Sequence, residues 1–125
     1  MRLNKMDHKT NIHELKNKVK AFCEARDWDQ FHNAKELAIA LTIEASELLE
    51  IFRWKKNEEV EALFNNSKKK EEIQDEMADV LYFLLRIAQL YNLDLSEALE
   101  SKLDKNNQKY PIDKFKGSHK KCNEV

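Results

Sequence analysis

Glycine and proline are nearly absent from this chain, and that scarcity is the strongest constraint on its fold. The 125 residues include one glycine, Gly117, and one proline, Pro111, both near the C-terminus. Folds built on β-sheets place these two residue types at many of their turns. Charged residues make up 36% of the chain and hydrophobic residues 42%, a mixture that is typical of long amphipathic helices. The sequence therefore predicts an all-α protein.

Apolar residues recur at helical spacing over four segments, residues 11–25, 33–54, 67–91 and 94–106. Asn33 and Asp94 each stand at the start of a segment with a glutamate three residues later, a pattern typical of an N-terminal cap. The lysines of the first segment are expected to face solvent, and residues 57–70 to form a solvated connection with room for one short helical turn. We expect a single domain over residues 1–125, ordered from about 10 to 115, with a disordered basic tail over 116–125.

The third segment is apolar on every side where it reads Val80-Leu-Tyr-Phe-Leu-Leu85. Such a helix must be covered on more than one face. The other three segments of one short chain do not suffice for that, so we predict a homo-oligomer that packs through residues 33–54 and 67–91.

Net charge and apolar patterning narrow the choice of partners and compartment. A net charge of −1 favours neither nucleic acid nor a membrane surface as a partner. No stretch approaches the roughly 18 apolar residues of a transmembrane helix, and the first ten residues lack the apolar region of a signal peptide. The two cysteines, Cys23 and Cys122, lie far apart in the sequence, which favours a reducing cytoplasm over a disulfide framework.

Two pairs of acidic residues stand at apolar positions of neighbouring helices. Glu44 and Glu47 form one pair, and Glu76 and Asp79 form the other. Residues at i and i+3 lie about 60° apart around an α-helix, so each pair projects from one face. Apolar residues surround both pairs, which indicates that these carboxylates lie at or near the inward faces of their helices.

Packing these two helices side by side would bring up to four carboxylates together. Like charges about 4 Å apart cost roughly 4 kcal/mol per pair at an effective dielectric constant near 20, so a cation is expected among them. Oxygen ligands favour a hard divalent ion, magnesium before zinc or copper. A di-iron site would need Glu-x-x-His motifs, and no histidine follows these acids at that spacing. A single Glu-x-x-Glu pair most often lies on a solvent-exposed helix face. Glu50 lies three residues after Glu47, and it could orient a water molecule, act as an outer-shell ligand or simply be exposed to solvent.

Aromatic and basic residues form two further clusters. Trp28 and His32 precede the second helix and Trp54 ends it; a flat aromatic pair can sandwich a nucleobase at about 1–3 kcal/mol per stacked base. Each ring taken alone is more often a core or hinge aromatic, and His32 an exposed loop histidine. The end of the fourth helix carries polar residues that could reach phosphates, or else complement the helix dipole. These residues are Lys102, Asn106, Lys109 and Tyr110.

Taken together, these motifs resemble those of the MazG-like all-α nucleoside triphosphate pyrophosphohydrolases, and within them the small dCTP pyrophosphatase branch. The resemblance covers roughly residues 10 to 115. It is carried by four stretches, residues 26–32, 43–55, 76–82 and 102–111, which contain Glu-x-x-Glu, Glu-x-x-Asp and a terminal Lys-Tyr-Pro.

The resemblance implies a four-helix protomer that assembles as a dimer or a dimer of dimers. It implies magnesium held by Glu44, Glu47, Glu76 and Asp79, and hydrolysis of a nucleoside triphosphate, dCTP-like by preference, to the monophosphate and pyrophosphate in nucleotide-pool cleaning.

In similar enzymes the positions of Trp28, His32 and Trp54 line the base pocket. The pair Tyr82-Phe83 stands where one tyrosine often contacts the substrate, so one of the two rings is expected there, and Phe83 is the one we assign. Ile43 and Ser46 stand where relatives commonly have glycine, which is expected to narrow the pocket.

The corresponding mechanism is attack of water on the α-phosphorus, with Glu47 or Glu50 accepting the proton of the water. The sequence leaves two alternatives open. The substrate could be dUTP or phosphoribosyl-ATP, or the chain could be a non-catalytic helical interaction module whose acids bind a structural cation.

Overall fold

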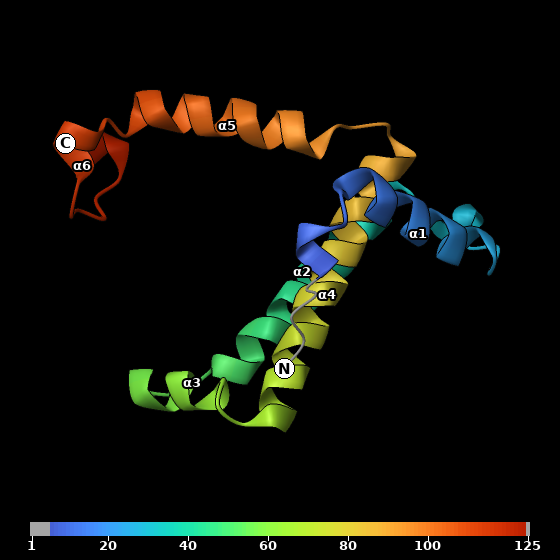
Figure 1. The fold of residues 1–125 in the computed structure, drawn as a ribbon, viewed down its shortest axis with the longest axis horizontal. Helices are drawn as coiled ribbons and strands as arrows, with labels where there is room; N and C mark the ends of the chain where they lie inside the picture. The colour runs from blue at the N-terminus through green and yellow to red at the C-terminus, as the bar shows by residue number, and fades with distance from the viewer. Residues whose placement is uncertain (1–5, 125) are drawn as a thin grey trace. The chain divides into compact units, whose positions relative to one another are not determined.

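The structure, a computed structural model, describes residues 6–124, and every regular element in that range is helical (Figure 1). The six α-helices are α1 (Ile12–Glu24), α2 (Ala34–Phe52), α3 (Asn57–Leu63), α4 (Ser67–Leu90), α5 (Leu95–Lys109) and α6 (Ile112–Phe115). Three short 3-10 helices accompany them, η1 (Met6–His8), η2 (Asp29–Phe31) and η3 (Cys122–Glu124). Within residues 6–124 there is no β-strand, and the all-α prediction is confirmed.

The described residues divide into two compact units. The first extends to Asn92, and the second begins at Leu93 and holds α5 and α6. The assembly of the four long helices into one bundle, the single domain and the disorder of the tail stay predictions.

Side-chain caps set where the long helices begin. The Oδ1 atom of Asn33 accepts a hydrogen bond from the backbone N–H of Glu36 at 2.9 Å, and Oδ1 of Asp94 accepts one from Glu97 at 2.8 Å. Both caps were predicted, because a short polar side chain there satisfies an N–H group that the helix leaves unpaired. After α4, Asn92 adopts a left-handed conformation with φ 54°, which ends the helix as expected.

Two boundaries differ from the prediction. Helix α2 ends at Phe52 rather than Trp54, because Arg53 leaves the helical region and Trp54 takes a left-handed φ of 65°. The connection that follows contains a seven-residue helix, α3, rather than a single turn. The ring of Phe64 at the end of α3 stacks on Phe52, with centroids 6.2 Å apart, so α3 is held against the end of α2.

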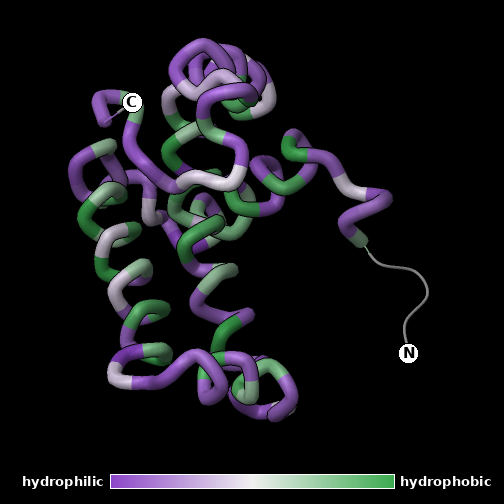
Figure 2. Tube along the Cα trace, turned by 90° about the vertical axis from the view of Figure 1, so that its left-hand side faces the viewer, coloured by the Kyte–Doolittle hydropathy of each residue, from purple (hydrophilic) through white to green (hydrophobic). Residues whose placement is uncertain are grey.

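Helix α4 is the centre of the first unit. It runs antiparallel to α2 along most of its length and also contacts α1 (Figure 1). The side chains that are fully buried gather along these contacts: Cys23, Leu37, Ile73, Leu85, Arg86 and Ala88. Hydrophobic and hydrophilic residues are interspersed along the helices, as Figure 2 shows, and α4 carries the longest apolar run, residues 80–85.

Large apolar side chains remain exposed on the first unit. Leu49 is 67% exposed, and Ile39, Ile43, Met77 and Leu81 are also more than one-third exposed. None of the described helices is both long enough and apolar enough to cross a membrane. The buried core of the first unit is small, and α2 and α4 keep apolar surface exposed.

The cap of α2 gives the first testable prediction. Replacing Asn33 by alanine removes the acceptor of the Glu36 N–H and should lower the free energy of unfolding by about 1 kcal/mol. Asn33→Asp keeps an oxygen at the same position and should cost much less. Urea unfolding followed by circular dichroism measures both variants, and equal stability of the two would contradict the capping role.

Candidate metal and nucleotide site

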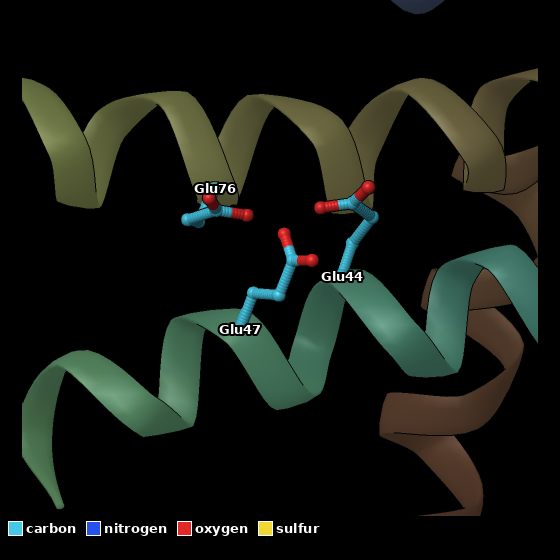
Figure 3. Close-up of side chains that lie close together, drawn as sticks. All are labelled: Glu44, Glu47 and Glu76. Atoms are coloured by element: carbon cyan, nitrogen blue, oxygen red, sulfur yellow. The ribbon is translucent and has the colours of Figure 1, made fainter.

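Three glutamates converge where α2 faces α4 (Figure 3). Glu44 and Glu47 come from α2 and Glu76 comes from α4, and one carboxylate oxygen from each lies within 4.8 Å of the others. The i,i+3 spacing places both α2 glutamates on the side that faces α4. The convergence of carboxylates that the sequence predicted is therefore present for three of the four acids.

Two oxygens of this cluster are buried without a partner. The Oε2 atoms of Glu44 and Glu76 are shielded from solvent, and neither forms a hydrogen bond within residues 6–124. Buried polar atoms in proteins are almost always paired, so an orphaned carboxylate oxygen needs an explanation. A divalent cation would satisfy both atoms, and three carboxylates are donors that magnesium accepts.

Burial and mutual repulsion disfavour the charged form of this cluster. Burial, followed by the nearby Glu47 and Glu76 carboxyl groups and the charge of Asp79, raises the pKa of Glu44 to about 7. Burial is also the main cause of the raised pKa of Glu76, and the charges of Glu47 and Asp79 add to it. Asp79 thus acts on the cluster electrostatically without being one of its three converging members. Its role as a metal ligand stays a prediction.

A cavity of about 450 Å³ lies on the α1 side of α4. Its walls are Lys18, Val19, Phe22, Trp28, Ala78, Asp79 and Tyr82. The ring of Phe22 packs edge-on against Trp28 at 5.8 Å and against Tyr82 at 5.9 Å, which fixes the aromatic walls. Asp79 belongs both to this lining and to the electrostatic surroundings of the glutamates, so an aromatic-walled cavity adjoins an acidic cluster.

The predicted base-pocket residues fall in different places. Trp28 lines the cavity, and His32 lies next to it with ring centroids 6.3 Å apart. Of the aromatic pair on α4, Tyr82 lines the cavity, whereas Phe83 packs edge-on against Tyr82 at 4.9 Å and is not part of the lining. Contact of Phe83 with a substrate stays a prediction.

Trp54 lies at the far end of α2 from Trp28. The helix between them has 19 residues, a length of about 28 Å at 1.5 Å per residue. Trp54 is 85% exposed and its ring lies under the guanidinium of Arg53. Within one chain the two tryptophans therefore cannot enclose the same base, which corrects the simplest form of the sandwich prediction.

Other predicted site residues lie outside the three-glutamate cluster. Glu50 is solvent-exposed and forms an ion pair with Arg53 at 3.4 Å. Ile43 lines a separate shallow groove on α2, so it does not narrow the 450 Å³ cavity. The residues expected to reach phosphates lie at the end of α5 in the second unit, and their role stays a prediction; they are Lys102, Asn106, Lys109 and Tyr110.

Lys18 is exposed, as the sequence predicted, although it also lines the cavity. One residue of this region was missed from the sequence. Arg86 is fully buried and bonds to His32 and Asp29. A signal for Arg86 existed, because it is the only charged residue between Val80 and Asn92, and an arginine in such an apolar run needs buried partners.

Comparison with known proteins places these features in a family. The model of the MazG-like family matches residues 39–125. The chain belongs to the MazG-like family. This confirms the resemblance that the acidic motifs indicated.

Curated relatives and a solved structure extend the match. The chain is 39% identical to rat dCTP pyrophosphatase 1 over 97 residues, which is 78% of this chain and 57% of that protein. It is 36% identical to human dCTP pyrophosphatase 1 over 104 residues, 83% of this chain and 61% of that protein. The chain thus spans about three-fifths of the length of these relatives. A crystal structure of a pyrophosphatase from Archaeoglobus fulgidus DSM 4304 superposes with a TM-score of 0.74 at 34% identity, covering 89% of this chain and 98% of that one.

The acidic cluster predicts an unusual dependence of stability on pH. Glu44 has a pKa of about 7 in the folded protein and an ordinary value of 4.5, so the folded state holds its proton more tightly than the unfolded chain does. The contribution of Glu44 is complete below about pH 4.5 and is lost as the pH rises through 7. With a chelator present, the midpoint temperature of thermal unfolding should therefore decrease as the pH is raised from about 5 to about 8.

Glu44→Gln should flatten this dependence, whereas Glu61→Gln on exposed α3 should not. Scanning calorimetry in EDTA across that range provides the measurement. If the midpoint temperature of the wild type did not decrease with pH more steeply than that of Glu44→Gln, repulsion among the carboxylates would be contradicted.

Proposed function

We propose that this MazG-like chain hydrolyses deoxynucleoside triphosphates, with dCTP preferred, to the monophosphate and pyrophosphate. The observation that carries the proposal is the group of three glutamates with two orphaned oxygens beside an aromatic-walled cavity. A nucleotide presents the complementary pair of features, a flat base and a chain of anionic phosphates. The names of the curated relatives, dCTP pyrophosphatases, and of the archaeal neighbour, a pyrophosphatase, support the same activity.

Glu44, Glu47 and Glu76, with Asp79 beside them, would hold magnesium. When bound, this ion would supply positive charge against the phosphate oxygens, which carboxylates alone would repel. The donor set fits, since it consists of oxygens only and two of them lack any other partner in the described chain.

The residues of the cavity would place the rest of the nucleotide. Trp28 offers a flat face for the base, and Asp79 marks the side of the cavity that meets the acidic cluster, so the phosphates would lie on that side. Fixing both ends of the nucleotide holds its α-phosphorus near the carboxylates, and positioning of this kind supplies much of the acceleration in phosphoryl transfer.

In the reaction, a water oxygen bonds to the α-phosphorus while the α–β anhydride bond breaks and pyrophosphate leaves. A carboxylate accepts the proton that the water gives up. Glu47 suits this role better than Glu50, because Glu47 belongs to the cluster whereas Glu50 is exposed and paired with Arg53.

Substitutions of the acids separate an enzyme from a binding module. Glu47→Gln and Asp79→Asn keep size and remove charge, so each should lower pyrophosphate release from dCTP about 100-fold or more while the circular dichroism spectrum stays native. Pyrophosphate should be released only with magnesium and not in EDTA, and Glu61→Gln should retain wild-type turnover.

A panel of dCTP, dUTP and phosphoribosyl-ATP assigns the substrate. Orthophosphate as the first product, or variants as active as the wild type, would reject the proposal. Binding of magnesium without turnover of any of the three would instead support a non-catalytic module.

We also propose that the chain forms a homo-oligomer through α2 and α4. The exposed apolar residues of these helices support it, above all Leu49 at 67% and Ile43 at 52% exposure. A second copy would also offer a way to bring Trp54 of one chain near Trp28 of another, which α2 prevents within one chain.

Leu49→Lys places a charge in this apolar surface and should convert the protein to a monomer at micromolar concentration. Asn17→Lys adds the same charge on exposed α1 and should leave the assembly intact. Sedimentation velocity distinguishes the species. A wild-type monomer at these concentrations would refute the oligomer.

A further inference from the structure

Arg86 is the only charged or polar residue that is fully buried within residues 6–124. We propose that Arg86 is a positioning residue, which fixes His32 as a neutral imidazole that donates a hydrogen bond from Nε2 to an acceptor atom of the nucleotide base. The hydrogen bond to a nucleotide base rests on the proposed function. The state of His32 follows from the geometry alone.

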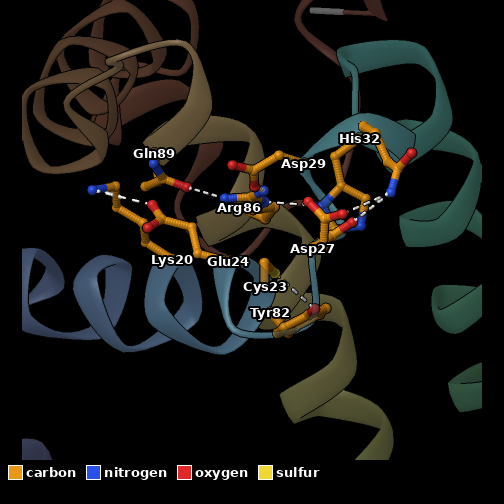
Figure 4. Close-up of polar contacts among 10 residues, drawn as sticks. Lys20, Cys23, Glu24, Asp27, Asp29, His32, Tyr82, Arg86 and Gln89 are labelled. Atoms are coloured by element: carbon orange, nitrogen blue, oxygen red, sulfur yellow. Dashed lines mark hydrogen bonds and ion pairs between the residues drawn. The ribbon is translucent and has the colours of Figure 1, made fainter.

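All three nitrogens of the Arg86 guanidinium are engaged (Figure 4). Nε donates to Nδ1 of His32 at 2.9 Å, Nη1 donates to Oε1 of Gln89 at 2.6 Å, and Nη2 forms an ion pair with Oδ1 of Asp29. Asp29 is the first residue of the short helix η2, which follows Trp28 directly, and His32 comes immediately after that helix. Arg86 thus ties the segment that carries Trp28 and His32 to α4.

The chemistry of the guanidinium decides which His32 nitrogen carries the proton. Arginine stays protonated in proteins and offers only donors. The Nδ1 atom that receives its hydrogen bond must therefore present a lone pair. A neutral imidazole with a lone pair on Nδ1 carries its hydrogen on Nε2. Adding a second proton would set an Nδ1–H group against the Nε–H group of Arg86 and break the bond.

The surroundings also keep His32 neutral. Burial lowers the pKa of His32, and the positive charge of Arg86 lowers it further, while the negative charge of Asp29 acts in the opposite direction. Together these effects hold the pKa of His32 below its ordinary value of 6.5. His32 is then a fixed donor near neutral pH rather than a group that changes its charge there.

The remaining nitrogen is available to a ligand. Nε2 of His32 has no hydrogen-bond partner in the part of the chain that the structure describes, and the residue is only partly buried. The ring lies 6.3 Å from that of Trp28, at an interplanar angle of 61°, and Trp28 lines the cavity. A base that stacks on Trp28 would lie beside His32. The matching groups are a ring nitrogen or a carbonyl oxygen, whereas an exocyclic amino group would present a donor to a donor.

Nitrogen NMR of the histidine side chains tests the tautomer directly. The chain has only 4 histidines, and the His32 signals are assigned by their loss in His32→Phe. In long-range proton–nitrogen spectra, wild-type His32 should show Nε2–H as its neutral tautomer near neutral pH, and its titration midpoint should lie below the ordinary value of 6.5. Population of the Nδ1–H form, or ordinary titration near pH 6.5, would overturn the proposal. This arm needs no Arg86 variant and no substrate.

Arg86→Met removes every donor while keeping a long side chain. In this variant the pKa of His32 should rise, because the positive charge of Arg86 is gone while burial and Asp29 remain, and the ring should lose its single tautomer. Ile73→Val, a core change on the same helix about 20 Å from Arg86 at 1.5 Å per residue, controls for lost stability and should leave the His32 signals unchanged. His32 signals that are the same in Arg86→Met as in the wild type would refute the role of Arg86.

Kinetics with dCTP test the link to the base. Loss of one hydrogen bond to the base should raise KM about 2- to 12-fold in either Arg86→Met or His32→Phe, with kcat nearly unchanged. The double variant should be no worse than His32→Phe, because Arg86 acts through His32. Additive losses would show that Arg86 has a merely structural role. If wild-type protein fails to hydrolyse dCTP, the proposed function fails, and the NMR result still decides the state of His32.

Discussion

Repulsion among three carboxylates on facing sides of α2 and α4 is the interaction on which the rest of the structure depends. The packing of these two helices holds Glu44, Glu47 and Glu76 within 4.8 Å and shields one oxygen of Glu44 and one of Glu76 from solvent. Without a positive partner, the cluster lowers its own charge by binding protons, which is why the pKa of Glu44 rises to about 7. A cation bound there would stabilise the folded protein and would in turn attract phosphates, as we propose.

Helix α4 connects the acidic cluster to the cavity and to His32. Its residues 76, 79, 82 and 86 follow one another at spacings of three and four, so they form one stripe along the helix. Glu76 joins the glutamates, Asp79 and Tyr82 line the cavity, and Arg86 holds His32. In the proposed complex this order along α4 would correspond to phosphates, sugar and base. The spacing of a single helix would then set the spacing of the bound nucleotide.

Sequence patterns gave reliable information where the physics is local. The caps at Asn33 and Asp94 depend on contacts three residues away, and the acidic pairs depend on helical spacing, so both could be predicted. Arg86 was missed because its partners Asp29 and His32 lie 57 and 54 residues away, and only the folded chain brings them together. The separation of Trp28 and Trp54, by contrast, could have been anticipated from the number of residues in the helix between them.

The most direct test of the central claim is to locate a divalent cation in crystals of this protein. Manganese replaces magnesium at many oxygen sites and gives an anomalous diffraction signal, so crystals grown with manganese at pH 8 would reveal its position. An anomalous peak in contact with carboxylate oxygens of Glu44, Glu47 and Glu76 is the predicted result. A peak elsewhere, or well-ordered glutamates with only water between them, would contradict the claim that this cluster is a metal site.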